Sequence, residues 1–418
     1  MSSTSWETKK LSEVADLCLG KMLDQKKNKG EYYPYLANLN VRWGAIEIED
    51  LRKMRFEKKE FERYGLKYGD IVMCEGGEPG RCAIWKNQAP SMMIQKALHR
   101  IRAKEKIDSL FLFYALLNKG LQGHYDGYFT GAAIKHLTGE KLAQVEVTLP
   151  QYSTQRKIAA VIEVYDDLIE NNLKRIKLLE EMAHITYEEW FVRMKYPGHE
   201  TAIFDEETGL PKSWTKNKIS DIGAVITGKT PSTSNEDFYG SDVPFIKTPD
   251  IAKAPYVINT DQSLSKLGAD SQLNKYLPKN SLVVSCIGTA GEFGFVSEPS
   301  QTNQQINAIK FNKDSFVFYM YCFAKHLKPL LEALGSNGAT MTNVNKSKFE
   351  GIDVVIPNED LLQDFNELTK NSFESILTLQ KKNKLLKEAR DILLPRLMSG
   401  MIDIEQIELP EAILKQRE

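Results

Sequence analysis

One repeated segment decides the architecture of this chain: Gly131-Ala-Ala-Ile-Lys-His-Leu-Thr-Gly-Glu-Lys-Leu-Ala-Gln-Val-Glu-Val-Thr-Leu-Pro150. It recurs without a gap, at an offset of 207, as Gly338-Ala-Thr-Met-Thr-Asn-Val-Asn-Lys-Ser-Lys-Phe-Glu-Gly-Ile-Asp-Val-Val-Ile-Pro357. Self-similarity at a fixed offset is the signature of a duplicated structural unit. The sequence therefore predicts two related halves.

Earlier segments support the duplication. Lys10-Leu-Ser-Glu-Val-Ala-Asp-Leu-Cys-Leu-Gly20-Lys21 matches Lys218-Ile-Ser-Asp-Ile-Gly-Ala-Val-Ile-Thr-Gly228-Lys229 at an offset of 208, and 34–36 resembles 244–246. Short β-branched runs bordered by Gly or Pro predict strands at 70–74, 145–149, 282–286 and 352–356. One apolar helix is expected in each half, at 109–118 and 316–328.

Each half then continues past its Pro into a long helical pattern. Apolar positions alternate at spacings of four and three, which is typical of the narrow seam of a coiled coil. The seam of the first helix contains Ile158, Ile162, Tyr165, Ile169, Asn172, Ile176 and Leu179, and that of the second Phe365, Ile376, Leu379, Asn383, Leu386 and Leu393. We expect two helices of about 33 residues, roughly 50 Å each.

Two related helices in one chain pair most easily in antiparallel orientation. If Asn172 faces Asn383, then Ile176 faces Leu379, and the offset of 207 turns one pair into the other through a pseudo-twofold axis. A polar Asn in a seam commonly fixes the register. The alternative is that each helix packs only on its own domain, because the second seam also contains polar residues.

The sequence thus predicts an α+β protein with two mixed α/β domains joined by an antiparallel coiled coil. The expected parts are domain 1 at 1–152, a central helix at 153–197, domain 2 at 198–357, a distal helix at 358–400 and a tail at 401–418.

Composition places the 418-residue chain, with 42% hydrophobic and 27% charged residues, among ordinary globular proteins. The longest apolar stretches are far shorter than the roughly 20 residues of a membrane span. The N-terminus carries no apolar signal segment, so we expect a cytoplasmic protein without membrane contact. The five cysteines are scattered without metal-ligand spacing and are expected to be reduced thiols.

The sequence contains no convincing catalytic or nucleotide-binding motif. The segment Gly223-Ala-Val-Ile-Thr-Gly-Lys-Thr230 fits the phosphate-loop pattern, but Pro231-Ser-Thr-Ser-Asn235 follows where that loop requires a helix. The sequence has no Gly-x-Gly-x-x-Gly cofactor loop and no Asn/Asp-Pro-Pro-Tyr/Phe motif, and its six histidines form no triad or metal spacing. We therefore expect no catalytic residue, no metal site and no enzymatic activity in this chain.

The formal net charge of −1 conceals an uneven distribution. Domain 1 has 24 Lys and Arg against 19 Asp and Glu, whereas domain 2 has 15 against 17. Basic and amide side chains hold phosphates and read base edges. The candidate DNA-contacting residues are Lys21, Lys26, Lys27, Arg42, Arg81, Thr130, Lys135, Lys229, Thr230, Ser232, Thr233, Lys247, Thr248, Asn303, Gln304, Gln305, Asn337 and Thr340.

These features together resemble the DNA-specificity subunit of Type I restriction-modification systems. The resemblance covers the whole chain and includes Gln155-Arg-Lys-Ile-Ala159 and Asp167-Leu-Ile-Glu-Asn-Asn172 in the first helix, and Leu393-Leu-Pro-Arg-Leu-Met-Ser-Gly-Met-Ile-Asp403 after the second. One departure is that Gln155 has Leu362 as its counterpart.

The resemblance implies two target recognition domains, each reading one half of a bipartite site in double-stranded DNA, with the coiled coil as the spacer. It also implies two modification subunits, which use S-adenosylmethionine to methylate adenine, and restriction subunits, which use ATP and Mg²⁺; no cofactor is expected in this chain. Helices of roughly 50 Å allow at most about 15 base pairs between domain centres. Because the domains differ in sequence and charge, the two half-sites are expected to differ.

Two alternatives stay open from the sequence. The chain could serve a Type II-like partner in which methylase and nuclease are fused, and only the partner's sequence distinguishes this. It could also be a coiled-coil scaffold whose loops bind protein. A scaffold predicts no sequence-specific duplex binding, whereas a DNA reader predicts an affinity that falls steeply with salt.

Overall fold

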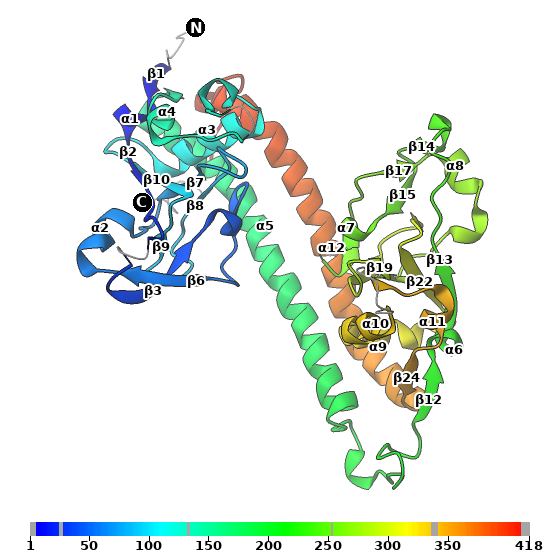
Figure 1. Ribbon diagram of the computed structural model, residues 1–418. Helices are drawn as coiled ribbons and strands as arrows, with labels where there is room; N and C mark the ends of the chain where they lie inside the picture. Colours follow the sequence, from blue (N-terminus) through cyan, green and yellow to red (C-terminus); the bar gives the residue numbers. More distant parts are fainter. Residues whose placement is uncertain (1–5, 25–27, 132–133, 252–253, 336–341, 411–418) are drawn as a thin grey trace. The chain divides into compact units, whose positions relative to one another are not determined.

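The structure is a computed structural model that describes residues 6–24, 28–131, 134–251, 254–335 and 342–410. It forms two compact units, unit 1 with residues 1–167 and 387–418, and unit 2 with residues 168–386. Compactness therefore divides the chain within its two long helices, whereas the expected boundaries fall at the helix ends. Figure 1 shows the helices and strands of both units.

Unit 1 is built on a four-stranded sheet of order β2-β10-β7-β8, with smaller sheets β1-β11, β6-β3-β9 and β4-β5. The strands are β1 (Glu7–Lys10), β2 (Ala15–Leu19), β3 (Glu31–Leu36), β4 (Val41–Arg42), β5 (Ala45–Ile46), β6 (Arg52–Phe56), β7 (Ile71–Cys74), β8 (Cys82–Ile84), β9 (Met93–Ile94), β10 (Leu98–Ala103) and β11 (Glu146–Leu149). The helices confined to this unit are α1 (Leu11–Val14), α2 (Phe61–Tyr64), α3 (Ser109–Leu121) and α4 (Gly139–Ala143).

Unit 2 repeats this topology. Its main sheet has the order β13-β22-β18-β20-β16, and β12-β24 corresponds to β1-β11. The strands are β12 (Thr215–Lys218), β13 (Gly223–Thr227), β14 (Tyr239–Gly240), β15 (Val243–Ile246), β16 (Tyr256–Val257), β17 (Ser263–Leu264), β18 (Leu282–Ser285), β19 (Ile287–Gly288), β20 (Phe293–Val296), β21 (Gln301–Thr302), β22 (Ile306–Phe311), β23 (Thr342–Asn343) and β24 (Asp353–Ile356). Its helices are α6 (Ile219–Ile222), α7 (Thr248–Ile251), α8 (Lys266–Asp270), α9 (Val317–Ala324), α10 (Leu327–Gly335) and α11 (Lys346–Glu350).

The predicted strands and the first apolar helix are confirmed, with ends shifted by a few residues. The single helix expected at 316–328 is wrong, because the chain breaks at Lys325 and His326 into α9 and α10. Gly223 to Thr227 forms strand β13, and a turn follows Lys229 instead of a helix, as the rejection of the phosphate loop requires.

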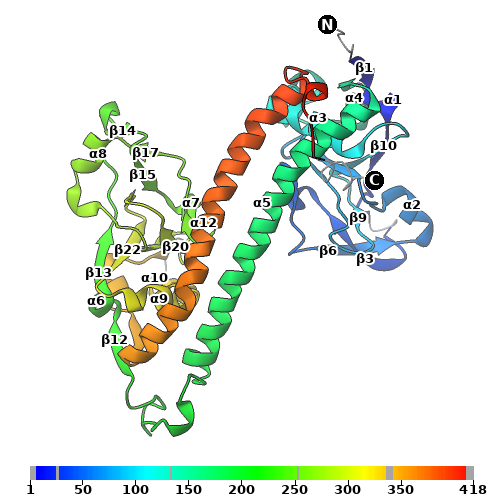
Figure 2. The same cartoon turned by 180° about the vertical axis from the view of Figure 1, so that it is seen from behind.

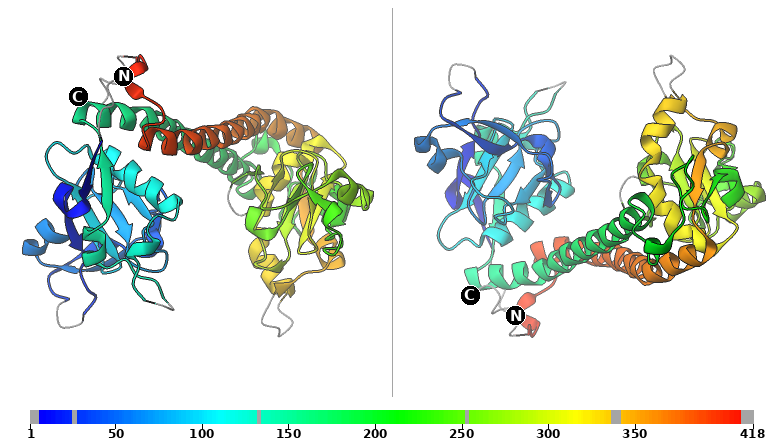
Figure 3. Two further views of the ribbon diagram at one scale, coloured as in Figure 1. Left: turned by 90° about the horizontal axis from the view of Figure 1, so that it is seen from above. Right: turned by 90° about the horizontal axis from the view of Figure 1, so that it is seen from below.

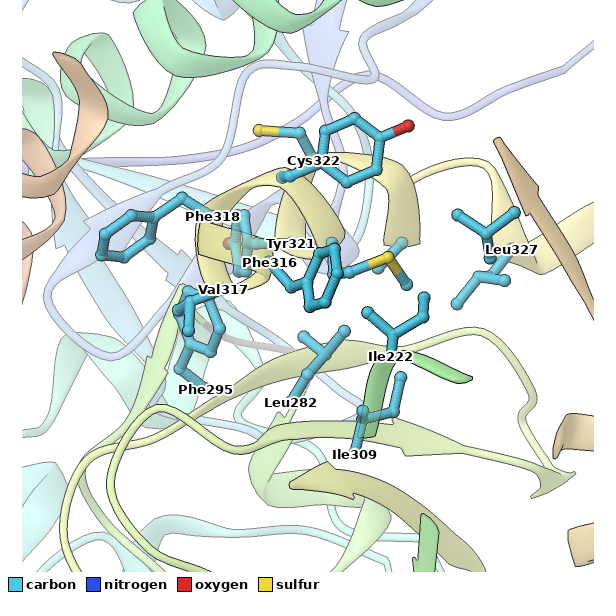
Figure 4. Close-up of a cluster of buried hydrophobic side chains, with 14 of the residues drawn as sticks. Ile222, Leu282, Phe295, Ile309, Phe316, Val317, Phe318, Tyr321, Cys322 and Leu327 are labelled. Carbon is cyan, nitrogen blue, oxygen red and sulfur yellow. The ribbon is translucent and has the colours of Figure 1, made fainter. Parts of the chain in front are cut away.

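Aromatic packing holds domain 2 together. Phe318 and Tyr321 of α9 lie over Phe295 and Leu282 of the sheet, and all four are buried (Figure 4). Phe373 of the second long helix stacks on Phe318 with ring centroids 4.5 Å apart. Aromatic pairs of this kind add to the stabilisation that burial of their area provides.

The two long helices are α5 (Tyr152–Tyr187), which ends in a π-helical turn at Glu188–Val192, and α12 (Glu359–Met398). Both exceed the expected 33 residues. In unit 2, Asn172 Nδ2 donates to Asn383 Oδ1 at 2.8 Å, which confirms the predicted facing pair. Ile176 and Leu379 belong to the same buried cluster.

The same antiparallel pairing is present in unit 1. Ile158 and Ile162 of α5 share a buried cluster with Leu394 and Leu397 of α12. The last turns of α12 and the segment after it lie beside the beginning of α5, and Thr154 Oγ1 donates to Glu405 there (Figures 2 and 3). The antiparallel coiled coil is therefore confirmed within each unit.

The alternative packing of the helices is also partly correct. Besides its seam, α12 buries Phe373 and Leu377 in the core of domain 2, and Gln380 donates to Tyr256 O at 2.8 Å. The helix has two apolar faces, one for α5 and one for the domain. This explains why polar residues dilute the seam predicted from spacing alone.

All five cysteines are free, as expected, and four of them are buried. Burial raises the pKa of the Cys286 thiol to about 11, so it carries no thiolate at neutral pH. Within the described ranges, no helix combines the length and apolar character needed to span a membrane.

Candidate nucleic-acid interface

The Gly-Lys pairs of the repeat begin the loops that carry many candidate residues. In domain 1, Lys21 N donates to Ile94 O at 3.0 Å, and in domain 2, Lys229 N donates to Thr302 O at 2.9 Å. Both loops leave the first strand of the main sheet at the same place. In both domains, the Gly-Lys segment therefore contacts the backbone of an equivalent second loop, at Ile94 in domain 1 and at Thr302 in domain 2.

The glycines of these pairs are required by close backbone approach. A Cβ added to Gly20 would lie 2.3 Å from Gln95 O, and one added to Gly228 would lie 2.2 Å from Asn303 O. Real Cβ atoms do not come so close, so only glycine fits either position. This is the physical reason for the Gly that the two repeats share.

A second contact holds the loops 94–97 and 302–305. Gln95 N donates to Leu36 O at 3.1 Å, and Asn303 N donates to Ile246 O at 3.2 Å. In both domains this bond continues a short parallel pairing, of β3 with β9 and of β15 with β21. The resemblance between 34–36 and 244–246 therefore reflects a shared role in supporting these loops.

A third contact closes each loop from the other side. Glu75 N donates to Ala97 O, and Cys286 N donates to Gln305 O, both at 2.8 Å. Leu137 N then donates to Glu75 O at 2.8 Å. Each loop is thus held by backbone bonds on three sides, which leaves its side chains as the variable part.

In each domain, a side chain of the main sheet bonds the backbone of a later segment, at Leu137 in domain 1 and at Val344 in domain 2. His99 Nε2 bonds Leu137 O at 2.8 Å, and in domain 2 Asn307 Nδ2 donates to Val344 O at 3.3 Å. Because the carbonyl oxygen of Leu137 only accepts, Nε2 of His99 is the donor, and burial lowers the pKa of this ring. His and Asn perform the same task at equivalent positions.

Lys21 was expected to contact DNA, but its side chain is buried and engaged inside domain 1. Only 3% of it is exposed, and its Nζ donates to Glu60 Oε2 at 2.6 Å and to Arg55 O at 2.9 Å. A buried ammonium with a carboxylate partner serves the fold. Its counterpart Lys229 is exposed, so equivalent lysines have different surroundings.

The other domain 1 candidates lie on or near the surface. Arg42 is exposed and pairs with Glu47, and Lys135 is exposed and pairs with Asp126 at 3.2 Å. Thr130 bridges to His136 across the base of its loop.

Arg81 is a bridging residue in the hairpin between β7 and β8. It donates to Glu78 at 2.7 Å and to Asn38 O at 2.8 Å, and these bonds tie the hairpin to the loop after β3. Its position in domain 2 is held by Glu292, because Cys74 N bonds Arg81 O as Ser285 N bonds Glu292 O. The two domains thus carry opposite charges there.

The domain 2 candidates gather around the loop 302–305. Thr230 Oγ1 donates to Gln304 Oε1 at 2.7 Å, and Asn303 Nδ2 donates to Gln305 Oε1 at 3.0 Å. Asn303 is 9% exposed, whereas Gln304 is exposed. The amide of Gln304 is therefore the one that presents itself to a ligand.

The remaining domain 2 candidates border this loop. Ser232 and Thr233 are exposed, and Lys247 is half-buried with its Nζ near the ring of Phe245. Thr248 Oγ1 is buried and has no hydrogen-bond partner among the described residues. The candidates that lie outside the described residues are Lys26, Lys27, Asn337 and Thr340.

Two residues of domain 1 escaped the sequence analysis. Gln95 and Lys96 occupy the positions of Asn303 and Gln304 in the loop that the backbone bonds define. The signal was present, because the offset of 208 that aligns Gly20 with Gly228 also aligns these loops. The letters themselves differ, which is why no match was visible.

Metal coordination has no candidate among the residues that the structure describes, where no group of three or more His, Cys, Asp or Glu side chains is arranged to hold an ion. The chemistry of this surface is that of amides, hydroxyls and ammonium groups. Such groups hold phosphates and read base edges.

Comparison with known proteins decides the family. Residues 4–181 and 211–388 match the model of the Type I restriction modification DNA specificity domain, and the two matches are themselves 207 residues apart. The chain belongs to the DNA-specificity subunits of Type I restriction-modification systems.

Named relatives agree with this assignment. The specificity subunit of the Type I restriction enzyme HindI from Haemophilus influenzae is 28% identical, over 87% of this chain and 92% of the relative. That of MjaIX from Methanocaldococcus jannaschii is 25% identical, over 96% and 94%. DNA recognition is the role of this specificity subunit.

The fold of the specificity subunit is shared with a crystal structure. The S subunit of a Type I restriction-modification system from M. genitalium superposes with a TM-score of 0.59 at 15% identity, covering 95% of this chain and 97% of that one. The two-domain architecture with long helices predicted from the repeat is therefore confirmed.

Proposed function

We propose that this specificity subunit reads an asymmetric bipartite site in double-stranded DNA, one half with each domain. The observation that carries the proposal is that one loop in each domain is held by an equivalent set of backbone hydrogen bonds. The loops 94–97 and 302–305 are held by matching backbone bonds but present different side chains. Two loops that are held by the same backbone bonds but carry different side chains support recognition of a different base sequence by each domain.

The charge distribution supports a division of labour between the domains. In domain 1, exposed cations follow strand β6, where Arg52, Lys53 and Arg55 all face solvent and Arg55 lies over the ring of Tyr32 at 5.0 Å. Domain 2 has Ser263 and Leu264 on the corresponding strand β17. Phosphate contacts should therefore contribute more to binding by domain 1 than by domain 2.

The paired helices supply the spacer between the half-sites. Helix α5 has 36 residues and α12 has 40, and the Asn172 to Asn383 bond sets their register. A buried polar pair penalises every other alignment of the two helices. A fixed register gives a fixed spacing between the two base contacts.

The proposal leaves catalysis to partner subunits. Two modification subunits would bring S-adenosylmethionine and methylate adenine, and restriction subunits would bring ATP and Mg²⁺, while this chain performs no catalysis. Its surface of amides and ammonium groups is suited to binding, and the assembly would act on DNA in the cytoplasm.

The decisive experiment is to map methylated adenines in a cell that expresses the chain with its modification subunits. We expect one motif with two different half-sites separated by a constant number of unspecified base pairs. Purified complex should bind that duplex with an affinity that falls steeply as salt rises. A continuous motif, or binding without sequence preference, would contradict the proposal.

A further inference from the structure

We propose that Lys96, in the loop 94–97, reads a guanine in the half-site of domain 1. The inference rests on the proposed function and assigns a specificity-determining residue within it. The inference starts from the equivalence of the loops 94–97 and 302–305. Only the loop in domain 2 could be recognised as a candidate DNA-contacting loop from its amide-rich sequence.

First, the loops 94–97 and 302–305 are structurally equivalent. Each accepts a bond at its first residue from the Gly-Lys segment, donates from its second to the end of a short strand, and accepts at its fourth from the neighbouring hairpin. Lys96 N also donates to Lys21 O at 2.9 Å, which fixes the backbone beneath the side chain. The position of the third residue is therefore set in both domains.

The second step is accessibility. Lys96 is exposed in domain 1, as Gln304 is in domain 2, and the residue before each is more buried. Among the described residues, no carboxylate lies within ion-pair distance of Lys96, whereas Lys21 beside it is engaged with Glu60. Among the described residues, Lys96 is thus a cation that this part of the loop cluster leaves available to a ligand.

The third step is chemical. The ammonium group of Lys only donates hydrogen bonds, and guanine offers two adjacent acceptors, O6 and N7, in the major groove. The amide of Gln304 has both a donor and an acceptor, which suits adenine N6 and N7. Equivalent loop positions should therefore select different base pairs in the two half-sites.

The test uses the full chain in complex with its modification subunits and a library of duplexes with randomised half-sites. The Lys96→Gln variant should lose preference for G·C at one position of the domain 1 half-site by about tenfold or more. Preference at the domain 2 half-site should not change. The reciprocal Gln304→Lys variant should shift one position of the domain 2 half-site toward G·C.

Lys106→Gln is the matched control, because Lys106 is an exposed lysine beyond the opposite end of strand β10. It removes the same charge and should leave both half-sites unchanged. Thermal unfolding of each variant shows whether the domain remains folded.

The outcomes separate this inference from the proposed function. If the unmodified chain selects no bipartite site, the proposed function fails. If it selects one but Lys96→Gln weakens all duplexes equally and lowers the salt slope by about one, Lys96 contacts phosphate and the inference is overturned. Unchanged selectivity by Lys96→Gln would overturn it as well.

Discussion

Asn172 and Asn383 meet across the helix seam of unit 2, where the side-chain amide of Asn172 donates to Asn383 Oδ1 at 2.8 Å. Only 7% of Asn172 and 5% of Asn383 are exposed. Asn383 Nδ2 also lies 3.4 Å from Ile169 O, so both amides find partners inside an apolar seam. A displacement of the register by one turn would leave both buried and unpaired.

The first prediction concerns this pair. Replacing Asn383 by Leu should destabilise the chain by about 1–3 kcal/mol, because it leaves the amide of Asn172 buried without its acceptor. The double variant, with Leu at both positions, should recover most of that loss. Equilibrium unfolding in urea across the four members of the cycle measures the coupling.

The expected coupling is at least about 1 kcal/mol, since the two side chains bond each other directly. Leu168→Ala is a suitable control, because Leu168 is on the same helix and is exposed. Additive effects of the two Asn substitutions would show that the bond does not set the register.

The second prediction concerns the close approach of Gly228 to the loop 302–305. Gly228→Ala would place a Cβ 2.2 Å from both Thr302 Oγ1 and Asn303 O, so the loop 302–305 must move. We expect a destabilisation of about 1–3 kcal/mol and loss of selectivity at the domain 2 half-site alone.

Gly127→Ala provides the control for this change. A Cβ on Gly127 has no atom within 4 Å, so its effect on unfolding should stay within about 0.5 kcal/mol. Normal half-site selection by Gly228→Ala would mean that the loop position does not matter for recognition.

Sequence pattern predicted most of the fold, because the repeat is visible by comparing the two halves of the chain and the seam spacing is visible within each helix. The facing of Asn172 and Asn383 followed from antiparallel pairing of the two seams together with the offset of 207. What the pattern missed depends on distant partners. Lys21 is buried because Glu60 lies beside it in the fold. Phe373, which is not a position of the predicted seam, is buried because it stacks on Phe318 in the aromatic core of domain 2.

The third prediction follows from the unequal surroundings of Lys21 and Lys229. Lys21→Met removes one partner of a buried ion pair and should destabilise the chain by about 3 kcal/mol, because the Glu60 carboxylate loses its counter-charge. Lys229→Met, on an exposed side chain, should leave unfolding unchanged within about 0.5 kcal/mol.

DNA binding should show the opposite order for these lysines. Lys229→Met should lower the slope of log affinity against log salt by about one if Lys229 holds a phosphate. Unfolding in urea and duplex binding at several salt concentrations measure both effects. Equal behaviour of the two variants would refute the distinction.

The fourth prediction is a pH dependence centred on His184 of α5. Burial, together with the positive charges of Lys325 and His326, lowers the pKa of His184 to about 4. Glu180 lies 3.9 Å from its Nε2, but the hydroxyl of Tyr321 already donates to that carboxylate at 2.7 Å.

Because the folded pKa lies below the ordinary value of about 6.5, the unfolded chain binds more protons between these limits. Stability should therefore fall as pH drops through this window, by roughly 1–2 kcal/mol from His184 once its partial exposure is taken into account. Urea unfolding at pH 7 and pH 5 should show a smaller difference for His184→Gln than for the unmodified chain. An equal difference would exclude His184 as the source.

The last prediction tests the helices as a spacer. The chain passes from one compact unit to the other after Asp167 in α5 and after Leu386 in α12. One heptad inserted after Asp167 and one after Leu386 keep every described contact on either side. Seven residues add roughly 10 Å of helix, so the unspecified spacer should lengthen by up to about three base pairs. Mapped methylation should then show the same two half-sites at the larger separation, whereas an unchanged spacing would mean that the partner subunits, and not the helices, determine it.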